Sequence, residues 1–331
     1  MASRRRRSDA SRARAPEGRP AADSTVSPQS SIQNGGSNAA GEKVHKAASL
    51  PQDTLVFGNV WRLSRDPNGS RLIQCVLDDA SGDDDRLRIA SELHGHAWQA
   101  MRCSHANHVL QKCIMTMRPL DIQFIIDELN ERGHAGICKA AQHEYACRVL
   151  QRLMEHCAPG QINSLIEVLL MDCTVLSRHI YGNFTMQHVL EYGSESQRHR
   201  LAVQLERHAS ILGWDHRGRK VLTKALSASC PADRMAIARA LLMEPDLLVC
   251  MAHARHGHMA AQLMIGILDG EFHEEAKRQL GEELPSLFGS RYGRKIVGSM
   301  GQTMRSPGNT QCEGRLEKPV VQQPSRRLGG C

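Results

Sequence analysis

Aromatic residues make up only 4% of the 331 residues, and several common features are missing as well. No apolar run reaches the roughly 18 residues that a membrane span requires, so we expect no membrane association. The N-terminus has no apolar h-region, which argues against a cleaved secretory signal. None of the eleven cysteines has C-x-x-C spacing. This odd set fits reduced, intracellular thiols, mostly at helical core positions such as Cys75, Cys113 and Cys157.

The net charge of +7 resides in the two ends of the chain. Residues 1–50 and 302–331 together contribute +8, which leaves −1 between them and excludes a uniformly basic nucleic-acid binder. Both ends are poor in large apolar residues, so we predict a disordered basic tail at 1–52 and a second disordered tail at 302–331. The run Arg4–Arg7 resembles an import signal, although such runs in tails more often are not one. Cys331 is the last residue and does not fit a prenylation box.

A nine-residue motif recurs seven times between the tails, in what we call the array (53–301). It reads GSRLIQCVL (69–77), ANHVLQKCI (106–114), ACRVLQRLM (146–154), GNFTMQHVL (182–190), GRKVLTKAL (218–226), GHMAAQLMI (257–265) and GRKIVGSMG (293–301). We number the residue after the leading Gly or Ala as position 1; successive copies lie 36 to 40 residues apart. Position 5 holds Gln in five of the seven copies, where the 19 glutamines of the chain predict fewer than one by chance.

Residues 134–170 show what one repeat contains. AGICKAAQ reads as a short helix, EYACRVLQRLMEHC as a second, and Pro159 opens a third, as proline does in a first helical turn. Apolar residues at helical spacing give the second helix one buried face, while Cys147, Arg148 and Gln151 point away from its centre. Three short helices cannot enclose a core alone, so the repeats must stack. We therefore predict an all-α fold, an α-solenoid whose second helices line one surface.

Charge is distributed unevenly within the array. The seven motif helices with their short leads sum to +7, so the rest of the array carries −8. This pattern indicates a basic stripe on an otherwise acidic body.

These motifs resemble the repeats of the Pumilio (PUF) family of RNA-binding proteins. DPNGSRLIQ (66–74), EYACRVLQ (144–151) and YGNFTMQHVLEYG (181–193) match the family's repeat closely, and SRYGRKIVGSM (290–300) is similar to its C-terminal cap. The resemblance implies a right-handed solenoid of three-helix repeats, curved into a superhelix. It also implies that single-stranded RNA is bound one base per repeat.

In that family, positions 1 and 5 bond to a base edge and position 2 stacks on a base. The resemblance assigns the base edges to Ser70 with Gln74, Asn107 with Gln111, Cys147 with Gln151, and Asn183 with Gln187. Their position-2 partners, which would stack, are Arg71, His108, Arg148 and Phe184. The Asn–Gln pairs resemble uracil readers and the Ser–Gln and Cys–Gln pairs resemble adenine readers, which implies a core 5′-UAUA-3′ on antiparallel RNA.

The later repeats depart from the family pattern. Their corresponding residues are Arg219, Lys220, Thr223, His258, Met259, Gln262, Arg294 and Lys295. No repeat carries the Ser–Glu pair that reads guanine, and seven repeats stand where the family has eight. We therefore expect base reading within residues 70–187 and mainly phosphate attraction from residues 215–298.

Three other functions fit parts of the sequence less well. His143 with Cys147, and CSHANHVLQKC at 103–113, gather thiols and imidazoles, but no third orienting group recurs and no zinc-module spacing appears. We therefore expect no catalytic residue, metal or cofactor. A protein-interaction scaffold of the HEAT or armadillo kind is a second alternative, but such a scaffold does not require glutamine at position 5 of successive motifs. A sequence-tolerant nucleolar relative acting in ribosome assembly fits the later repeats better than the first four.

The resemblance implies that the protein binds RNA and is not an enzyme. We expect a monomer that binds mRNA 3′ untranslated regions, located in the cytoplasm, with the nucleus as a second candidate location. Repression or decay would then act through recruited protein co-repressors, because the sequence shows no nuclease or deadenylase site.

Overall fold

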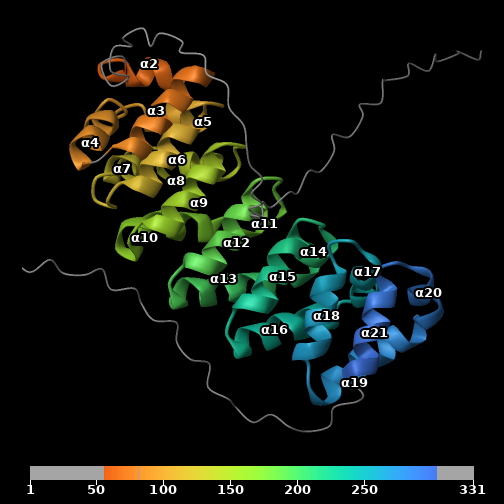
Figure 1. Ribbon diagram of the computed structural model, residues 1–331. Coiled ribbons are helices and arrows are strands. Elements are labelled where there is room, and N and C mark those ends of the chain that lie inside the picture. The colour runs from red at the N-terminus through yellow and green to blue at the C-terminus, as the bar shows by residue number, and fades with distance from the viewer. Residues whose placement is uncertain (1–55, 81, 304–331) are drawn as a thin grey trace, which may run out of the picture. The chain divides into compact units, whose positions relative to one another are not determined.

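The computed structural model describes residues 56–80 and 82–303, and within these ranges every regular element is an α-helix (Figure 1). The tail predicted at 1–52 lies outside the described residues, as does the one at 302–331 apart from residues 302–303, which end the last helix. None of the described helices combines the length and apolar content needed to cross a membrane.

The described helices form six three-helix units followed by a two-helix unit. The first helices are α2 (Val60–Ser64), α5 (Ala97–Arg102), α8 (Gly133–Ala141), α11 (Cys173–Arg178), α14 (Ala209–Trp214), α17 (Leu247–His253) and α20 (Leu284–Gly289). The second helices are α3 (Pro67–Asp79), α6 (Ala106–Thr116), α9 (Ala146–His156), α12 (Gly182–Tyr192), α15 (Gly218–Ala228), α18 (His258–Ile267) and α21 (Gly293–Thr303). The third helices are α4 (Asp83–Ser91), α7 (Gln123–Glu131), α10 (Pro159–Met171), α13 (Glu195–Arg207), α16 (Pro231–Leu242) and α19 (Gly270–Glu282).

Each second helix packs against the second helix of the next unit, from α3 through to α21 (Figure 1). The third helices of units 2 to 6 pack likewise on their neighbours, from α7 to α19. Each unit thus buries its apolar face against the next one, and the predicted α-solenoid is confirmed.

The three helices predicted within residues 134–170 are also confirmed, with ends of the first two that differ from the prediction by one or two residues. Helices α8, α9 and α10 fill this segment, and Pro159 is the first residue of α10. The Gln161 side chain accepts a hydrogen bond from the Ala158 N–H at 3.1 Å, which satisfies one of the donors that a helix start leaves unpaired. In α9, Val149, Leu150 and Leu153 are buried, as the apolar spacing predicts.

A polar residue four places before position 1 caps the second helix in five units. The side chain of this residue accepts hydrogen bonds from the first backbone N–H groups of the helix, as an N-cap residue does. The five are Asp66, His143, His179, Asp215 and Ser290. These caps lie outside the nine-residue motif, which is why the motif alone did not predict them.

Glycine before position 1 allows a close approach between helices in several units. A Cβ added to Gly182 would lie 2.7 Å from the carbonyl oxygen of Leu176, and one added to Gly218 would lie 2.5 Å from that of Leu212. Contacts this short do not occur, so these two second helices require glycine where they meet the preceding helix. Units 2 and 3 carry Ala106 and Ala146 at this place.

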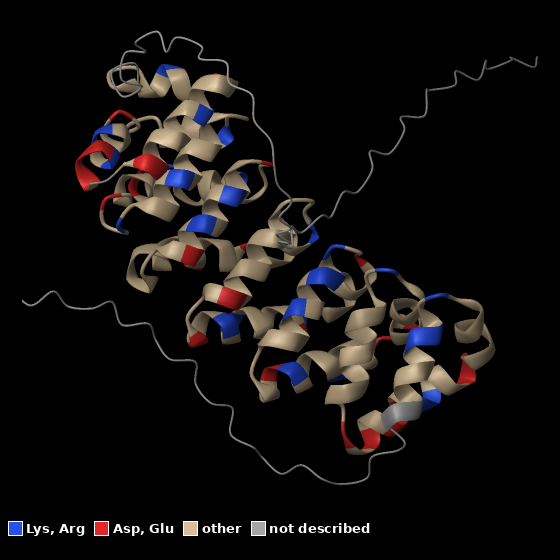
Figure 2. Cartoon of the chain, viewed as in Figure 1, with Lys and Arg blue, Asp and Glu red and all other residues tan. Residues whose placement is uncertain are grey.

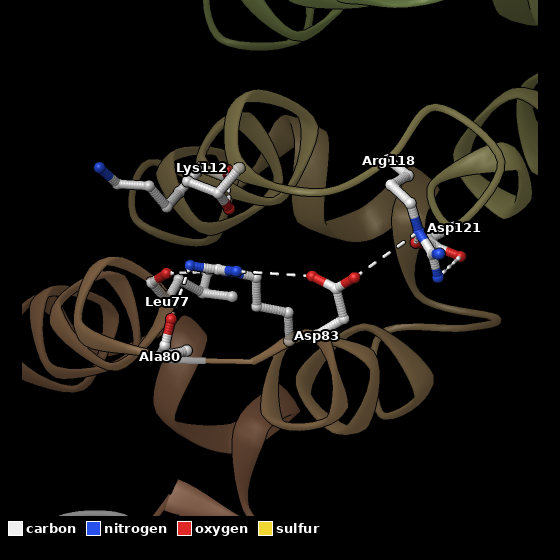
Figure 3. A network of polar contacts seen from close by, with 8 residues as sticks. Leu77, Ala80, Asp83, Lys112, Arg118 and Asp121 are labelled. Carbon is white, nitrogen blue, oxygen red and sulfur yellow. Dashed lines mark hydrogen bonds and ion pairs between the residues drawn. The ribbon is translucent and has the colours of Figure 1, made fainter. Parts of the chain in front are cut away.

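Polar side chains connect units 1 and 2 beside the buried core (Figure 3). Arg86 donates to the carbonyl oxygens of Leu77 at 3.2 Å and Ala80 at 2.8 Å, which closes the turn between α3 and α4. Asp83 lies between Arg86 and Arg118 of the next unit, 3.6 and 3.8 Å from their guanidinium nitrogens. The side chains of Asp83 and Arg118 are 52% and 65% exposed, so these ion pairs add orientation more than stability.

The prediction that Cys75 belongs to the core is wrong. Cys113 and Cys157 are buried, but Cys75 is exposed because it stands at position 6 of its motif, on the edge of the buried face. The nine cysteines within the described residues are free thiols.

Candidate nucleic-acid interface

Positions 1, 2 and 5 of the motif have the same exposure in each of the first four units. Position 1 is buried, position 2 is exposed, and position 5 is intermediate between the two. The buried set is Ser70, Asn107, Cys147 and Asn183, the exposed set Arg71, His108, Arg148 and Phe184, and the intermediate set Gln74, Gln111, Gln151 and Gln187. Residues at the same motif position therefore have the same exposure on α3, α6, α9 and α12.

Position 1 is more deeply buried than the helical spacing indicates. The spacing directs Cys147 away from the centre of the buried face, but the exposed fractions of Cys147, Asn107 and Asn183 are 3%, 0% and 1%. The Asn107 amide donates to the carbonyl oxygens of Cys103 at 2.7 Å and Ser104 at 3.0 Å. Asn183 donates in the same way to His179 and Ile180, both at 2.9 Å. Position 1 therefore satisfies carbonyl groups left at the end of the first helix.

These bonds fix how the asparagine amide is turned. Because both hydrogens of the Asn107 amide point to backbone carbonyls, its Oδ1 faces the other way and accepts from Gln111 Nε2 at 2.8 Å. The same pair recurs in unit 4, where Gln187 Nε2 lies 3.2 Å from Asn183 Oδ1. Each pair thus presents an acceptor next to a donor, with the glutamine nearer the surface.

Units 1 and 3 use smaller position-1 side chains. The Ser70 hydroxyl donates to the carbonyl oxygen of His105 in the next unit at 2.9 Å and accepts from Gln74 Nε2 at 3.2 Å. The Cys147 thiol lies 3.6 Å from the carbonyl oxygen of Glu144. Burial raises the pKa of this thiol to about 11, so it is protonated and acts as a donor at neutral pH.

Units 5 and 6 preserve the capping role of position 1 with different residues. Arg219 is buried, and its Nε donates to the Gly213 carbonyl oxygen at 2.6 Å. Buried His258 places Nδ1 3.0 Å from the carbonyl oxygen of Arg255, and its ring stacks on Tyr292 at 4.8 Å. The Thr223 hydroxyl donates to the Arg219 carbonyl oxygen at 2.7 Å. The expected phosphate contact of Arg219 does not fit this placement, because a buried guanidinium bonded to a carbonyl is not displayed to a ligand.

The remaining residues named from the later repeats lie nearer the surface. Met259, Arg294 and Lys295 are exposed, whereas Lys220 and Gln262 are intermediate. Lys220 Nζ lies 5.8 Å from the ring centroid of Phe184 in the preceding unit. Position 2 of unit 5 therefore contacts position 2 of unit 4 directly.

Part of the predicted basic stripe is neutralised between neighbouring second helices. Position 6 of one unit pairs with an acidic residue at position 9 of the unit before it. The pairs are Lys112 with Asp78 at 2.7 Å, His188 with Glu155 at 3.0 Å, and Lys224 with Glu191 at 2.8 Å. Figure 2 shows Lys and Arg distributed along the second helices and a cluster of acidic residues at α4. Within the motif, the displayed cations outside these pairs are therefore mainly those at position 2, namely Arg71, Arg148, Lys220 and Lys295, with Arg294 at position 1 of the last unit.

The profile of the Pumilio-family RNA binding repeat (PUF) matches this chain four times. The matched residues are 59–94, 101–129, 137–170 and 172–205. All four lie in units 1 to 4, where the pattern of buried, exposed and intermediate residues is complete.

Curated relatives carry the Pumilio name. A Pumilio domain-containing protein of Schizosaccharomyces pombe is 23% identical over 266 residues, which cover 80% of this chain and 37% of that protein. Pumilio homolog 12 of Arabidopsis thaliana is 22% identical over 243 residues, which cover 73% of this chain and 40% of the relative. The chain thus spans about two fifths of the length of these relatives.

Solved structures share the fold. The structure of PUF-8 in complex with PBE-RNA superposes with a TM-score of 0.67 at 23% identity, covering 76% of this chain and 74% of that one. The Puf3 RNA binding domain, bound to a Cox17 RNA 3′ UTR recognition sequence, gives a TM-score of 0.64 at 21% identity and covers 74% of each chain. The four profile matches show that residues 59–205 carry repeats of the Pumilio family; the curated relatives bear the Pumilio name, and the solved structures share the solenoid fold.

Proposed function

We propose that the surface formed by the second helices, from α3 to α21, binds single-stranded RNA with sequence selectivity. The observation that carries this proposal is the exposure pattern of positions 1, 2 and 5, which four successive units repeat in register. A polymer with evenly spaced bases matches such a surface one base per unit. The Pumilio family is a non-enzymatic, RNA-binding repeat family, and the similar structures named above contain RNA.

The asparagine pairs favour uracil. Asn107 Oδ1 and Gln111 Nε2 are an acceptor beside a donor, and the uracil edge offers N3–H beside a carbonyl oxygen. Adenine has an acceptor, N1, at the ring nitrogen, and would face Oδ1 with no hydrogen between them. An incoming base takes over the bond between the two amides, so recognition exchanges one hydrogen bond for two.

Position 2 supplies the planes between which bases stack. Guanidinium groups at Arg71 and Arg148, the His108 imidazole and the Phe184 ring are all exposed and flat. The adenine readers of units 1 and 3 alternate with the uracil readers of units 2 and 4. If the RNA runs antiparallel to the units, the core read by units 4 to 1 is 5′-UAUA-3′.

The biological setting follows from the same proposal. We propose binding to mRNA 3′ untranslated regions in the cytoplasm, with protein co-repressors supplying repression or decay. Lys220, Arg294 and Lys295 would add attraction to phosphates beyond the reading units.

Selection from a random RNA pool tests the proposal with the full chain. Enrichment of single strands that contain the UAUA core supports it. A Gln111→Ala, Gln187→Ala variant should lose selectivity at both uracils, whereas Gln204→Ala on α13 should retain it. Binding of any single strand without an enriched motif would favour the sequence-tolerant role in ribosome assembly. Failure to retain RNA would favour a protein scaffold.

A further inference from the structure

Three side chains of kinds that can ligate a metal ion lie together outside the proposed RNA-binding surface, at the junction of units 3 and 4. His134 and Cys138 come from α8, and Asp172 directly precedes α11. Asp172 Oδ2 lies 3.0 Å from Cys138 Sγ and 3.2 Å from His134 Nε2, and Sγ and Nε2 are 3.9 Å apart. An imidazole, a thiol and a carboxylate thus direct one atom each to a common point.

The distances among Asp172 Oδ2, Cys138 Sγ and His134 Nε2 are close to those around a zinc ion. Zinc binds cysteine sulfur at about 2.3 Å, histidine nitrogen at about 2.0–2.1 Å and carboxylate oxygen at about 2.0–2.2 Å. In a tetrahedral site these lengths place ligand atoms about 3.4–3.6 Å apart. Two of the three measured distances between ligand atoms are shorter than this range and one is longer. A change of about 0.6 Å or less in each distance would bring the three atoms to the separations of a tetrahedral zinc site.

The local structure explains how the three groups meet. His134 and Cys138 are four residues apart, so they lie on one face of α8. Asp172 is the N-cap residue of α11, where an aspartate ordinarily accepts from its own helix. Its carboxylate makes no such bond and is turned toward α8 instead. The Asp172 carboxylate therefore does not cap α11 and lies where it can act as a metal ligand.

The neighbouring junctions do not repeat the arrangement. His134 and Cys138 precede position 1 of their unit by thirteen and nine residues, and Asp172 precedes the next position 1 by eleven. At the junction before, these places hold His94, Trp98 and Gly136, and at the junction after, Leu170, Thr174 and His208. The trio is thus not required for stacking of the repeats.

We propose that His134, Cys138 and Asp172 bind one Zn²⁺ ion that joins units 3 and 4. Binding replaces the thiol proton of Cys138, which passes to solvent, and the thiolate, the neutral imidazole and the carboxylate each donate one electron pair to the metal. Water takes the fourth corner. Cys138 is buried, but the side chains of His134 and Asp172 are 47% and 37% exposed, which leaves a path for the ion.

Cobalt(II) is the probe, because thiolate ligation to Co²⁺ produces a charge-transfer band in the near ultraviolet and tetrahedral geometry gives visible bands. The full chain, freed of metal by a chelator, is titrated with Co²⁺ and then with Zn²⁺. We expect one equivalent of Co²⁺ to develop both sets of bands and Zn²⁺ to abolish them. Zn²⁺ should also raise the unfolding temperature, because it binds the folded chain.

Variants separate this site from other thiols and imidazoles. Cys138→Ala should remove the charge-transfer band, whereas Cys75→Ala, which removes an exposed thiol, should retain it. Asp172→Asn preserves side-chain volume and should reduce both cobalt binding and the zinc-dependent rise in unfolding temperature. His199→Ala, which breaks a histidine–aspartate pair that lacks a thiol, should alter neither.

Two results would overturn the site. One is the absence of a charge-transfer band from the parent chain, and the other is a band that persists in Cys138→Ala. Helical circular dichroism identifies any variant that fails to fold. If Cys138→Ala fails in this way, an unchanged cobalt spectrum in folded Asp172→Asn and His134→Gln likewise refutes the proposal.

Discussion

Lys220 Nζ lies 5.8 Å from the centre of the Phe184 ring, so position 2 of unit 5 covers the aromatic side chain at position 2 of unit 4. Under the proposed function, a base that stacks on Phe184 would occupy the space between these two residues. The ammonium group of Lys220 would then move from the ring to the nearby phosphates.

The first prediction concerns this ring. Phe184→Ala should weaken RNA binding by about 1–3 kcal/mol, or about 5- to 150-fold, because one base loses its stacking partner. Fluorescence anisotropy with a UAUA-containing RNA measures the change. Met259→Ala is the matched control, since this exposed position-2 residue lacks a ring, and its effect should be smaller. Equal losses in the two variants would show that Phe184 does not stack on a base.

The second prediction concerns phosphate attraction. Changing Lys220, Arg294 and Lys295 to Ala should weaken binding to all single-stranded RNAs alike. The slope of log affinity against log salt should become shallower by up to about 0.7 for each phosphate that the variant no longer neutralises. Arg219→Ala should leave the slope unchanged and lower stability instead, because Arg219 is buried against Gly213. Loss of binding to one sequence alone would mean that the three cations read bases.

The third prediction changes the base read by unit 3. Guanine presents two adjacent donors, which a carboxylate accepts and a glutamine amide does not. Cys147→Ser with Gln151→Glu should therefore convert unit 3 from adenine to guanine. A mismatched buried group costs about 1–3 kcal/mol, so the preference should reverse by about tenfold or more. Affinities for RNAs that differ only at that base decide the matter, and equal binding to both would remove this pair from the reading residues.

The fourth prediction concerns stability. Asn183→Ala removes the side-chain donor from the carbonyl groups of His179 and Ile180, and only the His179 carbonyl keeps a bond, from the backbone N–H of residue 183. The free energy of unfolding should therefore fall by about 1–3 kcal/mol. Gln187→Ala should cost less, because its side chain is less buried. Urea unfolding followed by helical circular dichroism compares the two. A larger loss in Gln187→Ala would contradict the capping role of position 1.

The fifth prediction concerns pH. Burial, and then Arg102, lower the pKa of His143 against the opposing effect of Glu144, while burial and Arg217 lower the pKa of His179. As pH falls below about 6.5, the unfolded chain takes up these protons first, so stability falls until the lower folded pKa values are reached. Both imidazoles cap their helices as acceptors, and a proton on the accepting nitrogen removes the bond.

His143→Asp and His179→Asp test this, because Asp215 already caps unit 5 at the same place. The difference in free energy of unfolding between about pH 7.5 and pH 5.5 should be smaller in the double variant than in the parent chain. An unchanged difference would assign the pH dependence to other histidines.

Spacing alone predicted most of the solenoid. Apolar residues at helical intervals, Pro159 and the recurrence of the motif located α8 to α10 correctly, because each unit buries the same face against its neighbours. Cys75 was misassigned for a local reason. It lies next to the buried face, and composition does not distinguish the edge of that face from its centre.

The sequence predicts which residues form the candidate site, and the structure adds the geometry of those residues, which the sequence does not contain. Periodicity placed positions 1, 2 and 5 on one side of the helix, but it does not reveal that Asn107 reaches back to the carbonyl groups of Cys103 and Ser104. The same limit applies to Arg219. No local pattern brings Asp172 to His134 and Cys138, since that proximity depends on how two units pack.

Position 1 both caps the first helix and faces the position-5 side chain, and this combination affects how such domains change over evolutionary time. Asn183 closes its own unit and also faces the neighbouring amide, so a mutation that alters base preference there also removes a cap. Position 5 carries no such constraint and is free to drift. New specificities should therefore arise first at glutamine sites such as Gln187, and an engineer who wants a new target without losing a stable scaffold should begin there.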